Sequence, residues 1–268
     1  MAILALQSAS SGLSALNTQL DVISNNLANV NTPGYKSSRA NFQDLLYVER
    51  MQPGVENAIG DQRPTGLYVG LGVRVSGTQL NFEQGAPLTT NQEKDLMIEG
   101  VGFFQVTVED ALGSIAYTRA GNFALNSDGE LVLANDVGRR LEPAITIPDD
   151  AIKIEVTNDG RVMVLQPGEV EPTEVGQIQL AAFVNPQGLA QIGENLYTQT
   201  EASGDPIVGN PSEDNLGTIR QGLLEASNVD PTRELVELIR TQRAFEMNSQ
   251  SIRAADDVLQ QVAQLRRG

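Results

Sequence analysis

The chain has 268 residues, 40% of them apolar, and can therefore bury the core of one large domain or two modest ones. Its 34 acidic and 18 basic side chains give a net charge of −16, which disfavours nucleic acids and anionic membranes because their phosphates would be repelled. The sequence has no Cys and no His, which excludes disulfides, thiolate metal sites and nucleophiles activated by histidine.

The ends of the chain differ from its middle. Residues 41–230 hold 28 acids and 10 bases, whereas residues 1–30 carry Asp21 as their single charge. No apolar stretch reaches the roughly 20 residues of a membrane-spanning helix. The opening run MAILAL is too short for the apolar part of a secretory signal. We therefore expect neither membrane insertion nor the ordinary secretory route.

The first 30 residues carry an apolar seam whose members alternate three and four residues apart, which is coiled-coil spacing. The seam consists of Leu6, Ala9, Leu13, Leu16, Leu20, Ile23, Leu27 and Val30. The residues between are mostly Ser, Gln, Asn, Thr and Ala, which suit contact with other helices on several sides better than contact with water. Pro33 and Gly34 should end this helix, because Pro disfavours helical geometry at Thr32 and Gly accepts left-handed turn conformations.

The middle of the chain changes to strand-like patterns. Residues 47–68 contain two Pro and three Gly without a clear period, which predicts an extended or loop-like arm. Alternating apolar residues then indicate an antiparallel β domain. Its clearest hairpin is IKIEVTNDGRVMVL, which places Ile152, Ile154 and Val156 on one face and turns at residues 158–160.

A second long helix is predicted at the C-terminal end, capped by Asp230 with Pro231 at its first position. Its apolar seam is interrupted by Gln242 and Ser249. The seam consists of Leu238, Phe245, Ile252, Ala255, Leu259 and Val262. The predicted fold class is therefore α+β, with long N- and C-terminal helices that pair as a coiled coil and a central antiparallel β domain. The predicted parts are residues 1–46, the N-terminal helix and its signature; 47–69, the arm; 70–226, the β domain; and 227–268, the C-terminal helix.

Candidate chemical motifs have ordinary structural explanations. Adjacent acids at Asp149 and Asp150, and at Asp256 and Asp257, point apart and are expected to be solvated. The glycine clusters complete no phosphate-binding loop, and NSDGE and TNDGR lack most ligands of a calcium loop. We expect no cofactor and no metal. For the two seams, an intramolecular helix pair that only stabilises a monomer remains an alternative.

Several motifs resemble the rod, hook and hook-associated axial proteins of the bacterial flagellum. NNLANVNTPGYK resembles their N-terminal signature, and SNVDPTRELVELIRTQRAFEMNSQSIRAADDVLQQVAQL resembles their C-terminal one. EGVGFFQV, YTRAGNFALNSDGELV and ENLYTQTEASGDP are similar to the β domain of the family. ANFQDLLYVERMQPG and GLYVGLGVRV resemble the distal rod type, with a proximal rod type of similar length as the alternative.

The resemblance implies a structural subunit, not an enzyme, that polymerises into a helical tube in the periplasm and transmits torque. The two seams would form the polymer interface of the inner wall, and the β domain would lie outside. The signature turn would consist of Asn29, Asn31, Thr32, Pro33, Gly34 and Tyr35. Implied partners are further copies, proximal rod proteins, the hook protein, surrounding rings and the flagellar type III export apparatus. The competing class is a soluble hydrolytic or carbohydrate-binding β module with a coiled-coil stalk.

Overall fold

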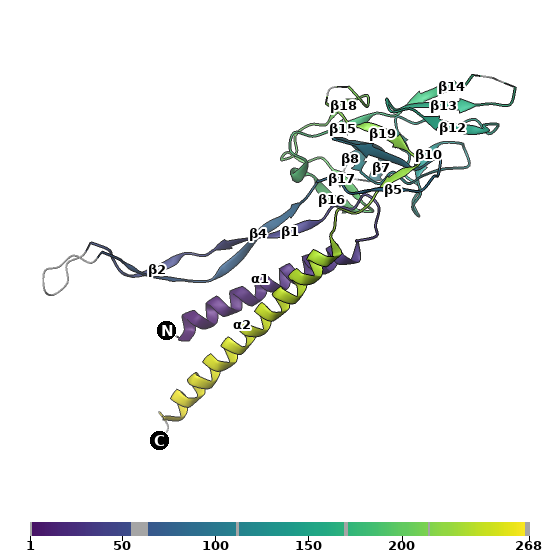
Figure 1. Ribbon diagram of the computed structural model, residues 1–268. Coiled ribbons are helices and arrows are strands. Elements are labelled where there is room, and N and C mark those ends of the chain that lie inside the picture. The colour runs from purple at the N-terminus through teal and green to yellow at the C-terminus, as the bar shows by residue number, and fades with distance from the viewer. Residues whose placement is uncertain (1, 55–63, 111–112, 169–170, 214, 266–268) are drawn as a thin grey trace. The chain divides into compact units, whose positions relative to one another are not determined.

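The computed structural model describes residues 2–54, 64–110, 113–168, 171–213 and 215–265. The chain forms two compact units. Unit 1 comprises Met1–Ala28, Ser38–Gln79 and Asp230–Gly268, and unit 2 comprises Asn29–Ser37 and Leu80–Val229. Figure 1 shows helices and a two-stranded ribbon in unit 1, and many short strands in unit 2.

Unit 1 contains the two α-helices of the described chain, α1 (Ala2–Ala28) and α2 (Pro231–Leu265). The predicted cap of α2 is confirmed: Oδ1 of Asp230 accepts hydrogen bonds from the backbone N–H groups of Thr232 at 2.9 Å and Arg233 at 3.3 Å. These bonds satisfy N–H groups that have no partner inside the helix.

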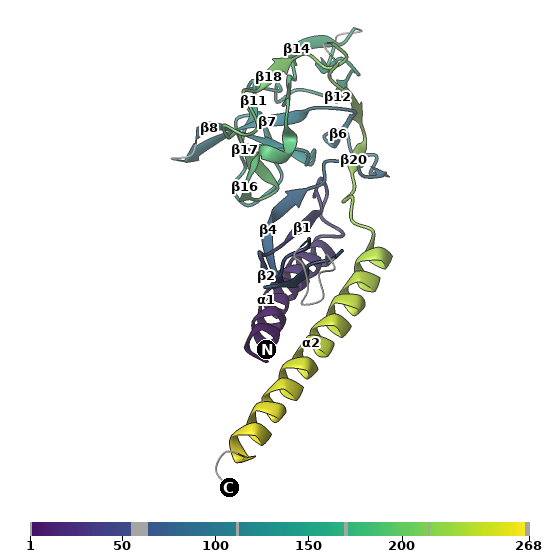
Figure 2. The same ribbon diagram turned by 90° about the vertical axis from the view of Figure 1, so that its left-hand side faces the viewer.

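The predicted coiled coil is wrong. The helices run antiparallel beside each other, and polar groups interrupt the contacts between them. Asn26 Nδ2 donates to Glu234 Oε1 at 3.3 Å, and the amide of Asn248 lies 3.3 Å from where a Cβ on Gly12 would stand. Figure 2 shows two separate helices, of which α2 is the longer, and no long paired coil among the described residues.

The physical reason lies in the α2 sequence. The residues of α2 that are buried or half-buried at coiled-coil spacing are alternately apolar and polar, and the polar ones are Glu234, Thr241 and Asn248. Every second side chain that a coiled coil would pack against its partner helix is therefore polar. Large apolar side chains such as Ile239 and Met247 are exposed instead, at 49% and 63%. A continuous apolar seam therefore exists on one helix only.

The ribbon of unit 1 joins two ladders. Strand β1 (Ser38–Asp44) pairs with β4 (Val73–Leu80), and β2 (Tyr47–Met51) pairs antiparallel with β3 (Leu67–Gly70). The segment predicted as an extended or loop-like arm thus contains β2 and most of β3, while its residues 55–63 lie outside the described chain. All five residues of β2 are exposed. Neither face of this strand is buried, so its sequence shows no alternation of apolar and polar residues from which a strand could be predicted.

Serines of α1 hold the ribbon. Ser8 Oγ donates to the carbonyl of Gly70 at 3.3 Å, and the N–H of Val73 donates to Ser11 Oγ at 3.2 Å. Gly72 has φ +119°, and a Cβ there would overlap Ser11. Helix α1 therefore touches α2 with one side and the ribbon with another, which explains part of its shortage of charge.

Unit 2 is built from short antiparallel strands. Its largest sheet has the order β16-β17-β8-β7-β15-β18, with β11 also on β7. A three-stranded sheet has the order β12-β13-β14, and the pairs β9-β10, β6-β19 and β5-β20 complete the described strands. The bounds are β5 Pro87–Thr89, β6 Leu96–Glu99, β7 Phe103–Asp110, β8 Gly113–Thr118, β9 Phe123–Leu125, β10 Leu131–Leu133, β11 Leu141–Glu142, β12 Lys153–Val156, β13 Arg161–Leu165, β14 Thr173–Gln177, β15 Leu180–Ala182, β16 Ala190–Gly193, β17 Leu196–Thr198, β18 Ile207–Gly209, β19 Thr218–Gln221 and β20 Leu223–Glu225.

The hairpin predicted at residues 152–164 is confirmed, because β12 pairs with β13 in a register that places Val156 opposite Val162. Gly160 closes its turn with φ +83°. Two cores lie on opposite faces of β7, since neighbouring residues of a strand point to opposite sides. Phe104 belongs to the larger aliphatic core, and Phe103 to an aromatic cluster that includes Tyr117, Phe183 and Tyr197.

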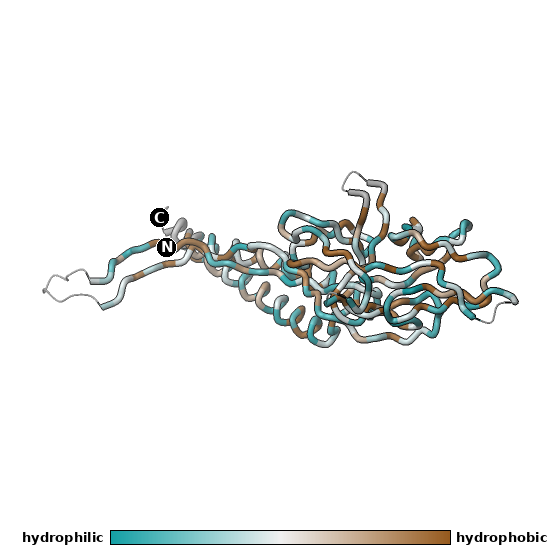
Figure 3. The backbone as a smooth tube through the Cα atoms, turned by 90° about the horizontal axis from the view of Figure 1, so that it is seen from above, coloured by the Kyte–Doolittle hydropathy of each residue, from teal (hydrophilic) through white to brown (hydrophobic). Residues whose placement is uncertain are grey.

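Apolar residues also occur outside these cores. Figure 3 shows hydrophobic segments recurring along the helices and the ribbon as well as within unit 2. No helix among the described residues is both long and apolar enough to span a membrane. In the same residues, no group of three or more acidic side chains is placed to hold a metal ion.

Candidate functional site

The Asn-rich turn that follows α1 folds as part of unit 2. Helix α1 ends at Ala28, so the helix stops before Pro33, and Val30 lies in the turn rather than on a helix. The N–H of Gly34 donates to the carbonyl of Glu225 at 2.8 Å, and Asn195 Nδ2 donates to the carbonyl of Pro33 at 3.1 Å. The turn is thereby attached to strand β20, which lies close before α2 in the sequence.

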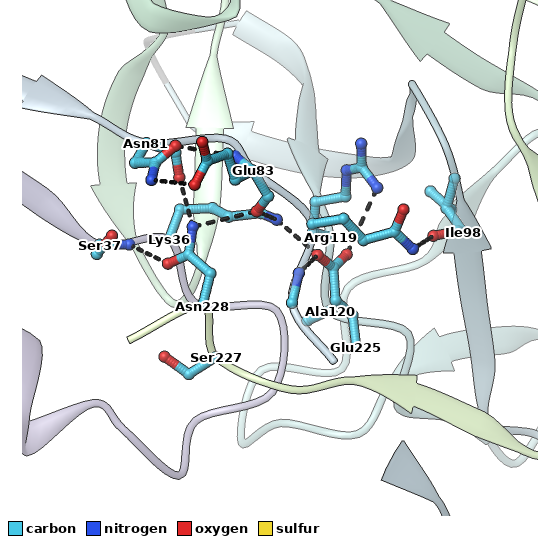
Figure 4. Close-up of polar contacts among 12 residues, drawn as sticks. Lys36, Ser37, Asn81, Glu83, Ile98, Arg119, Ala120, Glu225, Ser227 and Asn228 are labelled. Atoms are coloured by element: carbon cyan, nitrogen blue, oxygen red, sulfur yellow. Dashed lines mark hydrogen bonds and ion pairs between the residues drawn. The ribbon is translucent and has the colours of Figure 1, made fainter. Parts of the chain in front are cut away.

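A cluster of three buried charges lies beside this turn (Figure 4). Lys36 Nζ stands 2.6 Å from Glu225 Oε1, and Arg119 Nη1 stands 3.4 Å from Glu225 Oε2. The side chains of Lys36, Glu225 and Arg119 are exposed by only 1%, 0% and 6%. Two cations therefore share one carboxylate out of water, where an unpaired charge would cost several kcal/mol.

Neighbouring groups satisfy most of the remaining hydrogen bonds. Lys36 Nζ donates to the carbonyl of Glu83 at 2.8 Å, and Arg119 Nη2 donates to that of Gly100 at 2.8 Å. Glu225 Oε1 also accepts from the N–H of Gly85 at 2.8 Å. Among the described residues, Arg119 Nε is buried without a hydrogen-bond partner. Burial lowers the pKa of both Lys36 and Arg119, while the charge of Glu225 opposes that shift.

Tyr197 is expected to make the stability of unit 2 fall at alkaline pH. Burial, and then the charge of Tyr35, raise the pKa of Tyr197 well above its ordinary value of 10.0. Above pH 10 the unfolded chain loses this proton and the folded chain keeps it, so stability should fall by about 1.4 kcal/mol per pH unit. Urea unfolding between pH 9 and 11.5 should show a shallower decline for Tyr197→Phe. Below pH 10.5 the lowered pKa of Lys36 makes stability rise with pH. This contribution is the same in the unmodified chain and in Tyr197→Phe, so it does not affect the comparison. Equal slopes for both would contradict this assignment.

Gly34 is the tightest point of the turn. Its φ is +71°, and a Cβ would stand 2.6 Å from the N of Ala120 and 2.7 Å from the carbonyl carbon of Arg119. Gly34→Ala should therefore cost about 2–4 kcal/mol, from left-handed backbone strain plus displacement of neighbouring backbone. Gly204→Ala is the matched control, because Gly204 has φ +77° and open space around its Cβ position, so only the strain of about 1–2 kcal/mol applies. Urea unfolding of the two variants measures the difference, and equal losses would show that Gly34 is not packed as described.

The structure places the predicted interface residues on both helices. On α1, Ile23 is buried and the other seam residues are half-buried: Leu6, Ala9, Leu13, Leu16, Leu20 and Leu27. On α2, the half-buried seam residues are Leu238, Phe245, Ile252 and Ala255. Leu259 and Val262 lie within α2, but their side chains are outside the described part of the chain. A role of these residues in a polymer stays a prediction.

The turn residues differ in their burial. Gly34 and Tyr35 are buried, Asn29, Thr32 and Pro33 are half-buried, and Asn31 is exposed. Four further residues hold the turn and were not predicted from the sequence: Lys36, Arg119, Glu225 and Asn228. The one available signal was Lys36 itself, the first basic residue of the chain, directly behind the Gly-Tyr step.

Three family models match the chain. The model described as flagella basal body rod protein matches residues 6–36, the flagellar hook protein FlgE/F/G D1 domain matches residues 97–164, and the flagellar basal body rod FlgEFG protein C-terminal model matches residues 220–265. These segments cover α1 with its turn, much of unit 2, and β20 with α2. They define the class as flagellar rod and hook proteins.

Individual relatives narrow this class. The chain is 45% identical to the flagellar basal-body rod protein FlgG of Buchnera aphidicola subsp. Schizaphis graminum over 95% of this chain and 96% of the relative. The FlgG proteins of Caulobacter vibrioides, over 98% and 99% of the two chains, and Bacillus subtilis, over 98% of both, are 44% and 36% identical. The chain belongs to the flagellar basal-body rod protein family, which confirms the resemblance seen in its motifs. Its members are structural components of the flagellar basal body and not enzymes.

Proposed function

We propose that the chain is a subunit of the distal rod, that it polymerises into a helical tube, and that this tube transmits torque from the motor to the hook. The observation that carries the proposal is a set of large apolar side chains that α2 exposes. Besides the side that faces α1, the helix exposes further large apolar side chains, which are Leu235, Val236, Ile239, Met247 and Val258. A helix that exposes large apolar side chains in addition to the side facing its partner suits contact with a further neighbouring helix.

The distribution of charge supports the same arrangement. Unit 2 has 23 acidic and 8 basic side chains, whereas unit 1 has 11 and 10. Close packing of copies is least opposed by repulsion where the charge is balanced, so unit 1 would form the inner wall and unit 2 the outer surface. Export through the flagellar type III apparatus into the periplasm-spanning rod, and contacts with the proximal rod, hook and rings, belong to this proposal.

Assembly tests it directly. The purified chain, concentrated and viewed by electron microscopy, is expected to form tubes or rods, and Ile239→Lys should abolish them by placing a charge on the exposed side of α2. Ile152→Lys is the control, because Ile152 is an exposed apolar residue of unit 2. Uniform dimers from the unmodified chain would favour the competing β module with a stalk. If Ile239→Lys still formed tubes, the exposed side of α2 would not be part of the interface between subunits.

The ribbon provides a second prediction. Its β2-β3 part exposes Tyr47, Met51, Leu67 and Tyr68. The sequence between β2 and β3 contains Pro53 and Pro64, and Pro restricts the backbone more than Gly or Ser does. Deleting residues 50–63 should leave unit 2 folded and produce flexible rods or rods of uncontrolled length, because contacts between neighbouring subunits would be lost. Replacing residues 54–63 with a Gly-Ser segment of equal length is the control for chain length. Straight rods of normal length from the deletion, seen by electron microscopy of isolated basal bodies, would contradict the prediction.

A further inference from the structure

The chain passes between its two units four times, after Ala28, Ser37, Gln79 and Val229. Any force that passes along the backbone between the units therefore passes through these four peptide bonds. Within unit 2, segments next to three of them are hydrogen-bonded to one another.

Asn228 is the centre of these bonds (Figure 4). Its Oδ1 accepts from the N–H of Ser37 at 2.7 Å, and its Nδ2 donates to the carbonyls of Asn81 at 2.8 Å and Glu83 at 3.1 Å. Its own N–H donates to the carbonyl of Tyr35 at 3.4 Å, and the N–H of Asn81 donates to the carbonyl of Ser37 at 2.8 Å. Residues 35–37, 81–83 and 228 are thereby connected.

The chemistry of the side chain fits this role. An Asn amide offers an acceptor and a donor group on one short, planar side chain, and here both are used. Asp could accept from Ser37 but could not donate to the carbonyls of Asn81 and Glu83, and Ala could do neither. The ion pair of Lys36 and Glu225 joins the same two segments, one residue before Ser37 and three residues before Asn228.

Unit 1 holds its side of one connection in the same way. The N–H of Ser38 donates to Asn26 Oδ1 at 3.0 Å, and Asn26 Nδ2 donates to the carbonyl of Ser38 at 2.8 Å. The amide of Asn26 also reaches Glu234 in the first turn of α2, and Asn26 is only 2% exposed. Ser37 and Ser38, on either side of the unit boundary, are thus each fixed by an Asn within their own unit.

We propose that Asn228 is a positioning residue that makes three of the four connections act as one joint, so that load leaving unit 2 is shared among them. The hydrogen bonds of Asn228 distribute over three segments a load that a single peptide segment would otherwise carry alone. The proposal rests on the torque-bearing function proposed above. It adds that the stiffness of the subunit depends on this amide as well as on contacts between subunits.

Hydrogen exchange tests the joint without any assembly. In the full-length chain, Asn228→Ala should accelerate exchange of the Ser37 amide about five- to tenfold, because its acceptor is removed. Amides of the β6-β19 pair should be unchanged. Asn228→Asp keeps the acceptor and should leave Ser37 close to the original rate. Asn185→Ala is the control, since Asn185 is an exposed Asn of unit 2 that donates to the carbonyl of Ala202 at 3.0 Å. An unchanged Ser37 rate in Asn228→Ala would overturn the assignment.

A mechanical measurement tests the consequence. In motile cells that carry the variants, Asn228→Ala and Asn228→Asp should both increase the torsional compliance between motor and hook at least twofold, measured by the recoil of a bead when the motor stops. Asn185→Ala should not. If the unmodified chain forms no rods, the proposed function fails while the exchange result still stands. If rods form and the Asn228 variants are as stiff as the control, the joint carries no load and the inference is wrong. The near-ultraviolet circular dichroism of the tyrosines checks that each variant is folded.

Discussion

Glu225→Gln is expected to destabilise unit 2 by about 3–5 kcal/mol, because it leaves Lys36 and Arg119 buried without a counter-charge. The neutral amide can still accept a hydrogen bond, but it cannot offset two desolvated cations. The loss should exceed that of any exposed ion pair in the chain. Urea unfolding followed by the tyrosine signal measures it, since Tyr35, Tyr117 and Tyr197 are buried in unit 2 and the sequence has no Trp.

Two matched variants make this prediction specific. Lys36→Met removes the surplus cation and leaves Arg119 and Glu225 as a one-to-one pair, so its cost should be smaller than that of Glu225→Gln. Glu99→Gln breaks the pair with Arg220, in which both side chains are about half exposed, and should cost less than about 1 kcal/mol. If Glu225→Gln cost no more than Glu99→Gln, the buried cluster would not hold the turn in unit 2.

The features of the fold that could be predicted from the sequence are those that depend on neighbouring residues. Asp230 and Pro231 mark the start of α2 because capping depends on neighbouring residues alone, and the turn at residues 158–160 marks a hairpin for the same reason. The prediction of a coiled coil was wrong because it depended on the apolar residues of α2 that recur every seven residues, which fill only alternate positions of a coiled-coil seam. The polar residues at the alternate positions, Glu234, Thr241 and Asn248, were given too little weight.

The buried cluster could not be predicted because its members are far apart in the sequence. Lys36 and Glu225 are separated by 189 residues, and Arg119 and Glu225 by 106. No periodicity connects such positions, and each residue alone is typical of a solvated surface. The turn was expected to end α1 because of its Pro and Gly. Its attachment to unit 2 depends on a backbone hydrogen bond to Glu225, which cannot be predicted from residue types.

In dilute solution, both helices are expected to exchange their amide protons rapidly, while unit 2 is strongly protected. The contacts between α1 and α2 are polar at Asn26 and Asn248, and the exposed large apolar side chains of α2 have no cover within the described chain. Isolated helices are marginal in water, so much of their stability must come from packing. Neighbouring subunits would supply that packing, which couples the local stability of the helices to polymerisation and helps to keep subunits from assembling early.

Hydrogen exchange with mass spectrometry on the dilute chain and on assembled rods measures this coupling. Peptides from residues 5–28 and 231–265 should gain protection of at least a hundredfold on assembly, whereas peptides from 80–229 should change little. Limited proteolysis of the monomer should remove the helices first. Asp230→Ala is a useful second variant, because loss of the α2 cap should accelerate exchange in the first turns of α2 of the monomer and leave the unit 2 sheets unaffected. Strong protection of residues 5–28 in the monomer would show that the helix pair is stable alone, and the coupling to assembly would then be wrong.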